Sequence, residues 1–298
     1  MQNYKIGLWS MNMGFAPASV QAFADHIERR MEDTASAGGR LLVMPEYAVE
    51  AALSLKTEGL KPTEEMAFLC HVGHSLKTAV RHLPEQTGVS LLLGSMPVKR
   101  QAGFTNTALL LTSDGREISQ DKLCLTPGEA DPDSWTLVPG TELQVFDLDG
   151  IKTAILICLD VEMPALSSLL AKADIELLLV PSMTERLAGY HRVYGCAKAR
   201  AVELMCAVAV CGTVGPAKGT TQNETNVSGA ALYLPCEEEL GHAGIGIDLP
   251  PTGGTHAYEH FSVASVPIDT LRKLKAGEAE VWPGAWTADH VRLTKNYQ

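Results

Sequence analysis

The chain has 298 residues, 46% of them hydrophobic, and its 24 basic and 35 acidic side chains give a net charge of −11. Because no basic cluster is present, we expect no nucleic-acid or membrane partner, although a locally basic pocket could bind one small carboxylate. No apolar run approaches the roughly 18 residues of a membrane helix, and the opening MQNYKIGLWS lacks the features of a secretory signal.

Seven cysteines are scattered through the chain without any CxxC pair. An odd number with this spacing disfavours both a disulfide framework and a thiolate-rich zinc site, and it suits a reducing compartment. We therefore expect a cytoplasmic protein without a metal site.

Apolar runs of strand length alternate with helical patterns along the chain. The expected strands are residues 4–11, 40–47, 88–98, 106–118, 153–159, 175–182, 205–215, 227–235 and 261–268. The expected helices are residues 20–35, 62–80, 163–172 and 189–204. Gly38-Gly39 marks the end of the first helix, and Pro62 opens the second.

This order mixes β-α-β units with hairpins, one of them at Asp114-Gly115. Most of the strands are apolar on both faces, so they need cover from helices or from a second sheet. A layered α/β sandwich therefore fits better than a barrel, because hairpins interrupt the strict β-α alternation.

No linker rich in Pro, Gly or Ser divides the chain, which predicts one domain over residues 1–275. The polar segment 215–226 is expected to form a mobile surface loop. The tail 276–298 carries Trp282, Trp286 and Tyr297 without periodicity. Such a tail packs either at a subunit interface or back on its own chain.

Three apolar segments end on reactive side chains. The apolar run in LLVMPEY leads to Glu46, the run in AILICLD leads to Cys158, and SQDKLCLTPGE places Lys122 after the hairpin with Glu129 seven residues later. Alone, each has an ordinary structural explanation, and a buried cysteine usually serves as a small hydrophobe. Together their chemistry is complementary, because a carboxylate can accept a thiol proton while an ammonium stabilises the anion. The ammonium and the backbone N–H after the thiol could also hold an oxyanion.

In that order, Glu46 in MPEY, Lys122 in DKLCLTPGE and Cys158 in ICLDVEMP resemble the motifs of the nitrilase (carbon–nitrogen hydrolase) superfamily. The resemblance extends from the first strand to about residue 270 and includes YGCAKARAVELMCAVAVCGTVG. It implies a four-layer α-β-β-α sandwich that forms a homodimer or a higher homo-oligomer.

The resemblance also implies residue roles. Cys158 would be the nucleophile, Glu46 the general base and Lys122 the group that stabilises the tetrahedral intermediate. The N–H of Leu159 would complete the oxyanion hole, and Glu129 would orient the substrate and the lysine. The implied reaction passes through a thioester and requires no metal and no organic cofactor.

The family's nitrilases usually have Trp-Glu after the cysteine, whereas this chain has Leu159-Asp160. This favours the amidase-like branch, with a small-molecule amide or carbamoyl compound as substrate and ammonia or an amine as product. VPSMTERLAGYHRVYGCAKARA is similar to nitrilase-type domains found attached to acetyltransferases. Asp160 and Glu162 are interpreted as caps of the following helix, and Arg200 and Glu203 as a structural pair.

Residues near the nucleophile are expected to select the substrate. They are Tyr47, Met183, Thr184, Arg186, Tyr190 and Arg192, with Glu185 and His191 beside them. Arg186 or Arg192 could grip a substrate carboxylate in bidentate fashion, but either could equally form a surface ion pair.

Other functions stay open at this point. Nitrile hydrolysis, or acyl transfer to an amine, would use the same thioester. A Cys-His enzyme would tolerate replacement of Glu46 or Lys122 and would need one essential histidine. A catalytically silent scaffold of the same fold would lack an activated thiol at Cys158.

Overall fold

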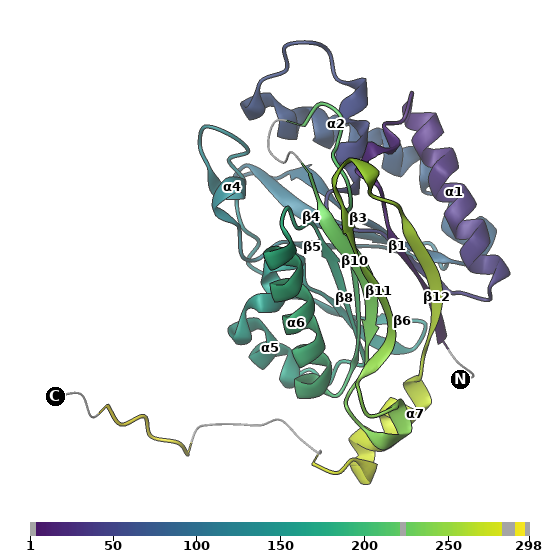
Figure 1. The fold of residues 1–298 in the computed structure, drawn as a ribbon, viewed down its shortest axis with the longest axis vertical. Helices are drawn as coiled ribbons and strands as arrows, with labels where there is room; N and C mark the ends of the chain where they lie inside the picture. The colour runs from purple at the N-terminus through teal and green to yellow at the C-terminus, as the bar shows by residue number, and fades with distance from the viewer. Residues whose placement is uncertain (1–3, 221–224, 282–289, 296–298) are drawn as a thin grey trace.

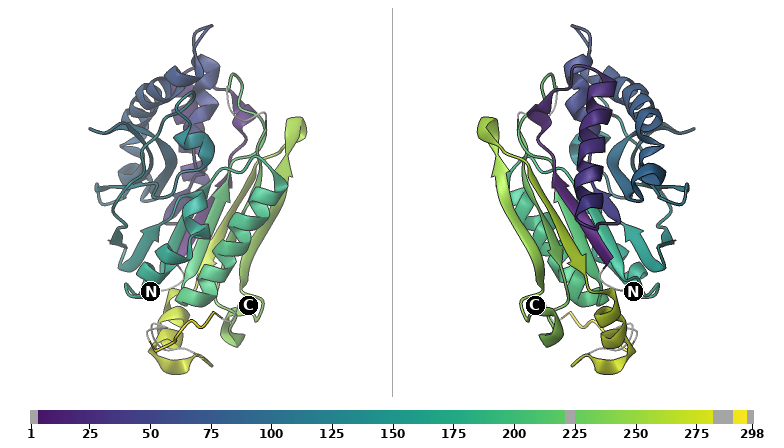
Figure 2. Two further views of the ribbon diagram at one scale, coloured as in Figure 1. Left: turned by 90° about the vertical axis from the view of Figure 1, so that its left-hand side faces the viewer. Right: turned by 90° about the vertical axis from the view of Figure 1, so that its right-hand side faces the viewer.

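The computed structural model describes residues 4–220, 225–281 and 290–295. Two six-stranded mixed sheets face each other, and helices cover the outer face of each (Figures 1 and 2). The predicted four-layer α-β-β-α sandwich is therefore confirmed. In the described part of the chain, no helix combines the length and apolar character required to cross a bilayer.

The first sheet has the strand order β12-β1-β2-β3-β4-β5. Its strands are β12 (His260–Val266), β1 (Tyr4–Ser10), β2 (Leu41–Val43), β3 (Ser90–Lys99), β4 (Phe104–Leu111) and β5 (Glu117–Asp121). Strand β2 runs parallel to both neighbours, and the other pairs are antiparallel.

The second sheet has the order β11-β10-β9-β8-β7-β6. Its strands are β11 (Ile245–Gly253), β10 (Val227–Tyr233), β9 (Ala207–Gly212), β8 (Leu177–Ser182), β7 (Ile151–Ile155) and β6 (Val145–Leu148). The central three, β7 to β9, are parallel, and the outer pairs are antiparallel.

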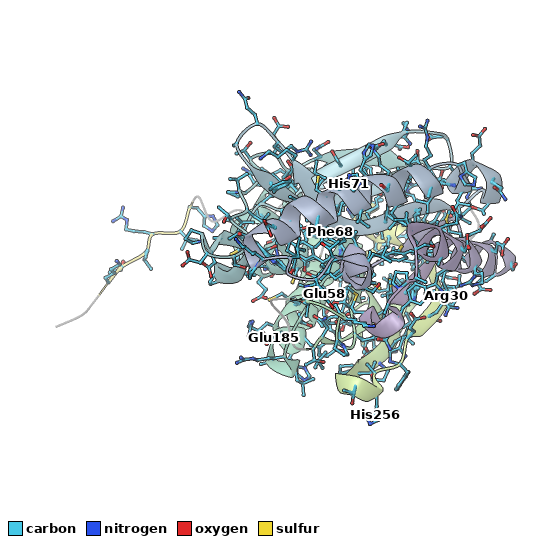
Figure 3. The ribbon with its side chains drawn as sticks, turned by 90° about the horizontal axis from the view of Figure 1, so that it is seen from above. Arg30, Glu58, Phe68, His71, Glu185 and His256 are labelled. Carbon is cyan, nitrogen blue, oxygen red and sulfur yellow. The ribbon has the colours of Figure 1, made fainter. Side chains whose placement is uncertain are left out.

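Helices α1 (Val20–Ser36), α2 (Pro62–Val80) and α3 (Leu83–Thr87) cover the first sheet, and α5 (Pro164–Ala171) and α6 (Leu187–Leu204) cover the second (Figure 1). Seen from above, Phe68 and His71 on α2 lie at one side of the molecule and Glu185, just before α6, toward the other (Figure 3). The remaining helical segments are η1 (Met13–Phe15), η2 (Ala48–Leu55), α4 (Pro127–Ala130), η3 (Cys158–Glu162), η4 (Glu238–Leu240), η5 (Gly254–His256), α7 (Ile268–Lys273) and η6 (Leu274–Glu278).

Side-chain alternation along the strands builds the layers. In β2, Leu41 and Val43 join the cluster between the two sheets, whereas Leu42 joins Phe23 and Ile27 of α1 in the outer cluster. A strand that presents apolar groups to both faces is covered on both faces. This is why the sequence reads as continuous apolar runs.

Two strands were not expected, and two expected strands end early, one of which, residues 40–47, is a strand only over Leu41–Val43. β6 and β11 were not expected, because they are short or proline-containing edge strands with many exposed residues. The expected strand 153–159 ends at Ile155, and Cys158 instead begins the 3-10 helix η3. The polar, proline-flanked sequence after Cys158 favours this turn.

The terminal and loop expectations fall partly on residues outside the described ranges. Trp282, Trp286 and Tyr297 lie there, so the domain boundary at 275 and the packing of the tail stay predictions. Residues 221–224 of the expected mobile loop also lie outside. At the base of that loop, Gly215 and Asn226 exchange backbone hydrogen bonds of 2.9 and 3.1 Å.

Candidate active site

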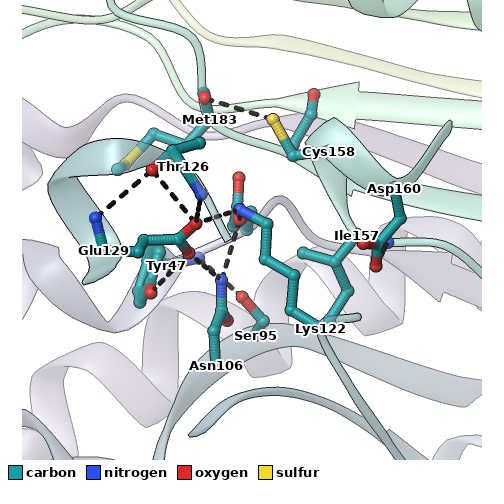
Figure 4. A network of polar contacts seen from close by, with 12 residues as sticks. Tyr47, Ser95, Asn106, Lys122, Thr126, Glu129, Ile157, Cys158, Asp160 and Met183 are labelled. Carbon is teal, nitrogen blue, oxygen red and sulfur yellow. Dashed lines mark hydrogen bonds and ion pairs between the residues drawn. The ribbon is translucent and has the colours of Figure 1, made fainter. Parts of the chain in front are cut away.

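Cys158 lies at the sharp turn that follows β7. Its backbone has φ of 48°, a left-handed conformation that is uncommon for a residue with a Cβ and recurs at functional sites. The thiol is 6% exposed and donates to the carbonyl oxygen of Met183 at 3.5 Å (Figure 4). The apolar strand before it anchors the backbone, and the turn leaves the sulfur at the end of the sheet.

Glu46 lies in the turn after β2, where Pro45 cannot continue a central strand. A bulge in β3 supports this turn, since the pairing register shifts between Leu92 and Ser95. The hydroxyl of Ser95 accepts the Tyr47 N–H at 3.2 Å. Gly94 has φ of 69°, and a Cβ there would lie 1.9 Å from the Pro45 carbonyl oxygen. Only glycine permits this approach.

Lys122 joins the two acids. Its Nζ lies 2.8 Å from Oε1 of Glu46 and 2.7 Å from Oε2 of Glu129 (Figure 4). The three side chains are 2%, 2% and 3% exposed, respectively. Two carboxylates therefore share a single ammonium away from solvent.

Further hydrogen bonds hold the two acids in place. The N–H of Thr126 donates to Glu129 Oε2 at 2.9 Å, and the Tyr47 hydroxyl donates to Glu129 Oε1 at 3.0 Å. The side-chain amide of Asn106, on β4, donates to both Glu46 and Glu129, at 2.8 and 3.0 Å. Sequence reasoning missed Asn106, although a lone amide inside the apolar strand FTNTALLL was the available signal.

The surroundings shift the pKa values of the two glutamates in opposite directions. Burial raises the pKa of Glu46, against the opposing effect of Lys122. Burial also opposes ionisation of Glu129, but Lys122 and the Thr126 N–H hold the pKa of its carboxyl below the usual value. Burial alone would lower the pKa of Lys122, yet the two carboxylates raise it well above normal. The ammonium therefore stays charged.

The thiol of Cys158 is neutral at rest. Burial, followed by the charge of Glu46, raises its pKa well above the ordinary value, and Lys122 only partly opposes this. Glu46 and Cys158 line the same pocket, so the carboxyl faces the space that the thiol opens on. A proton acceptor thus lies beside a thiol that must lose its proton in order to attack.

Asp160 does not cap helix α5, so that part of the interpretation was wrong. It lies within η3, fully buried, and its carboxylate accepts the N–H groups of Ile157 at 3.1 Å, Leu123 at 3.1 Å and Cys124 at 2.7 Å. Burial raises its pKa to about 6, against the effect of these hydrogen bonds.

Glu162 is not a cap either. It forms an ion pair of 3.3 Å with Arg192 of α6. The expected pairing of Arg200 with Glu203 is confirmed, at 2.7 Å. Arg200 also donates from Nε to the Val161 carbonyl oxygen, which ties the η3 turn to α6.

A pocket of about 580 Å³ opens above these groups. Its lining includes Glu46, Lys122, Glu129 and Cys158, and also the expected Leu159, Tyr47, Met183, Thr184, Arg186 and Arg192. Glu185, Glu162, Trp135, Gly128, Ala188 and Gly189 complete much of the wall. Tyr190 lies elsewhere: its ring packs against Tyr194, with centroids 4.1 Å apart, in the core beneath α6.

Within the described residues, no group of three or more His, Cys, Asp or Glu side chains is arranged to hold a metal ion. Two histidines lie three residues apart on α2, a spacing that could suit a metal pair. Both, His71 and His74, lie on the exposed face of the helix and belong to no such group among the described residues.

Comparison with known proteins gives one family. A family model described as carbon-nitrogen hydrolase matches residues 5–243. A probable hydrolase, YhcX, of Bacillus subtilis is 28% identical over 255 residues, which are 86% of this chain and 48% of that protein. The chain thus spans about half the length of this relative. A hydrolase of Mycobacterium tuberculosis, Rv0480c, is 24% identical over 80% of this chain and 85% of its own.

Solved structures share the fold. A cysteine-to-alanine mutant of the amidase from Nesterenkonia sp. AN1, in complex with butyramide, has a TM-score of 0.67. The match is 22% identical and covers 92% of this chain and 95% of the amidase.

Proposed function

Because this chain belongs to the carbon–nitrogen hydrolase family, we propose that it hydrolyses a non-peptide amide or carbamoyl bond of a small molecule through a cysteine thioester. The observation that carries the proposal is the buried Lys122 ammonium, held between Glu46 and Glu129 beneath a pocket that also exposes Cys158. Hydrolase chemistry at this coarse level also agrees with the names of the relatives.

In the proposed first half-reaction, Glu46 accepts the Cys158 proton as the sulfur attacks the substrate carbonyl carbon. Lys122 and the N–H of Leu159, in the first turn of η3, stabilise the tetrahedral oxyanion. Collapse of this intermediate breaks the carbon–nitrogen bond. The protonated Glu46 returns its proton to the departing nitrogen, which leaves as ammonia or an amine.

In the second half-reaction, Glu46 takes a proton from water, which attacks the thioester carbonyl. Collapse releases the carboxylic acid, and the proton returns to the Cys158 thiolate. The contrast between the two glutamates supports this division of roles. Glu46, whose pKa is raised, exchanges protons, whereas Glu129, whose pKa is lowered, stays ionised and keeps Lys122 in place.

The composition of the site bears on four alternative functions. In the described part of the chain, no histidine lines this pocket, which disfavours a Cys-His enzyme. A silent scaffold would gain nothing from a buried ionic cluster that is costly to desolvate. Nitrile hydrolysis and acyl transfer to an amine would use the same groups, so the products must distinguish them from amide hydrolysis.

The first test uses reagents that react with a known relative. Acrylamide and fluoroacetamide add to the active-site cysteine of glutamate-to-glutamine mutants of the Nesterenkonia amidase. We expect fluoroacetamide to add one acetamide moiety to the parent protein and none to Cys158→Ala, as measured by intact-protein mass spectrometry. The Cys70→Ala variant, which removes a half-buried thiol on α2, should react like the parent. An adduct that survives in Cys158→Ala would contradict the assignment.

Ammonia release from a panel of amides, N-carbamoyl compounds and nitriles, with and without amine acceptors, then identifies the reaction. Hydrolysis predicts ammonia and free acid from amides, with both lost in Cys158→Ala. Amide conversion without free acid in the presence of an amine would instead establish acyl transfer.

Assembly and location are part of the proposal. We propose that the protein acts in a reducing cytoplasm as a homodimer or a higher homo-oligomer, with residues 276–298 as a tail beyond the catalytic domain. Light scattering coupled to size-exclusion chromatography tests the assembly. A mass of one 32.0 kDa chain at micromolar concentration would contradict it.

A further inference from the structure

One buried carboxylate bridges the two halves of the site without belonging to the lysine cluster. Asp160 follows the nucleophile by two residues, and its two oxygens accept three backbone N–H groups. Leu123 and Cys124, which supply two of these groups, directly follow Lys122. Ile157, which supplies the third, directly precedes Cys158.

These backbone segments come from different sheets. The Lys122 segment leaves β5 of the first sheet, and the Cys158 turn leaves β7 of the second. The backbone of Lys122 bonds to Asn106 on β4 at 2.8 Å and to Gly140 at 2.7 Å. These bonds hold the Lys122 segment independently of the second sheet.

The Cys158 turn is held independently of the first sheet, by the hydrogen bond from Arg200 of α6 to the Val161 carbonyl oxygen. Asp160 bonds to both segments at once.

We propose that Asp160 is a positioning residue, whose carboxylate holds the Lys122 ammonium and the Cys158 sulfur at the separation that attack and oxyanion stabilisation require. The inference rests on the proposed function. It adds a determinant outside the pocket lining, since Asp160 acts only through backbone N–H groups and does not touch the substrate.

The chemistry of the group suits this purpose. Hydrogen bonds from N–H groups to a carboxylate are short and about twice as strong as neutral ones, so three of them restrict both segments. Reactive groups must lie within about 0.5 Å of their productive geometry, and a misplacement of about 1 Å can cost roughly 100-fold in rate. An asparagine at position 160 would keep one acceptor oxygen but would place an NH₂ group against a backbone N–H donor.

The test compares Asp160→Asn with a matched control, Glu176→Gln. Glu176 is also a buried carboxylate that accepts a backbone N–H, that of Lys152 at 2.9 Å. It lies before the start of β8, whereas the site lies beyond the other end of that strand. Both variants should lower the urea midpoint of unfolding.

Only Asp160→Asn should slow the formation of the Cys158 adduct with fluoroacetamide, by about 10- to 100-fold. On an amide substrate it should lower kcat with KM within about threefold of the parent, because the pocket wall is unchanged. An equal adduct rate in Asp160→Asn and the parent, or an equal loss in Glu176→Gln, would overturn the inference.

A parent protein that forms no Cys158 adduct and also releases no ammonia from any amide of the panel would instead overturn the proposed function, so the two failures are distinguishable. If Asp160→Asn does not fold, Asp160→Glu replaces it, since it keeps the charge but moves the carboxylate by one methylene. A parental adduct rate in a folded Asp160→Glu protein would then contradict the inference.

Discussion

At the scale of single residues, the site is a buried ionic cluster whose charges do not cancel. Glu46 and Glu129 share one ammonium, with Asn106 donating to both. Breaking a buried ion pair by removing one partner typically costs about 3–5 kcal/mol, because the other charge stays unpaired. Such a cluster is poor for stability, and the proton transfer that we propose for Glu46 gives a reason for its presence.

The raised pKa of Glu46 predicts the acid limb of the pH profile. Glu46 accepts a proton only when ionised, and burial raises its pKa despite Lys122. Activity should therefore fall as the pH drops through a value above about 4.3, the ordinary pKa of a glutamate. The raised pKa of Lys122 should keep that ammonium charged through the alkaline range. A profile of kcat/KM from pH 4 to 10 measures this, and full activity at pH 4 would contradict it.

Asn106 should be required for full activity although its side chain carries no charge. Asn106→Leu removes two hydrogen bonds to carboxylates, each contributing about 1.5–3 kcal/mol, and leaves both acids under-satisfied. We expect kcat/KM to fall at least roughly tenfold. Thr107→Val is the control, because it removes a hydrogen bond to Asp121 from the same strand but outside the pocket lining. Equal activity in the two variants would show that Asn106 has no special effect.

At the scale of elements, the bulge in β3 positions Glu46, the proposed general base. Gly94→Ala would place a Cβ 1.9 Å from the Pro45 carbonyl oxygen at a positive φ. A left-handed non-glycine residue costs about 1–2 kcal/mol, and overpacking adds about 1–3 kcal/mol. Gly94→Ala should therefore destabilise the fold by at least about 2 kcal/mol and impair activity.

Gly115→Ala separates the cost of the left-handed backbone from the cost of the steric clash. Gly115 also has a positive φ, of 86°, but open space surrounds the position of its missing Cβ. Only the conformational cost, about 1–2 kcal/mol, should appear in its urea unfolding curve, with unchanged activity. Equal losses of stability in both variants would show that the contact with Pro45 is unimportant.

The elements that the sequence revealed least well are those shaped by contacts far along the chain. The expected strand through Cys158 in fact gives way to η3, whose Asp160 bonds to a segment more than thirty residues earlier. A local pattern that favours a cap could not reveal that partner. β11 was missed because its prolines and exposed alternation fit a loop as well as an edge strand.

At the scale of the whole molecule, the pocket is assembled from both halves of the sandwich and is widened by small residues. Gly128 lies in α4 and Gly189 in α6, and both line the pocket wall. A volume of about 580 Å³ lies within the usual range for drug-sized ligands. We expect larger amides than acetamide to be accommodated.

Gly128→Leu tests this use of space. No atom lies within 4 Å of a Cβ at this position, so the new side chain can narrow the pocket without a backbone clash. The ratio of kcat/KM for long-chain to short-chain amides should fall by about 10-fold or more, the scale of steric discrimination by one or two methylenes. Gly195→Leu, on an exposed site of α6 with equally open space and outside the pocket lining, should leave the ratio unchanged. An unchanged ratio in Gly128→Leu would exclude Gly128 from substrate selection.

The layered α/β architecture follows from the amino-acid sequence alone, because strands that are apolar on both faces must be covered on both. The same reading indicated four candidates: Glu46 and Cys158 close to the ends of apolar runs, and Lys122 and Glu129 in one segment after the hairpin. Which groups meet depends on the tertiary structure. The tertiary structure places Asn106 beside the two acids and Asp160 beside the Lys122 segment. It also pairs Arg192 with Glu162 and packs Tyr190 in the core. Those contacts join residues far apart in the chain, and side-chain direction at a turn depends on packing that no local pattern records.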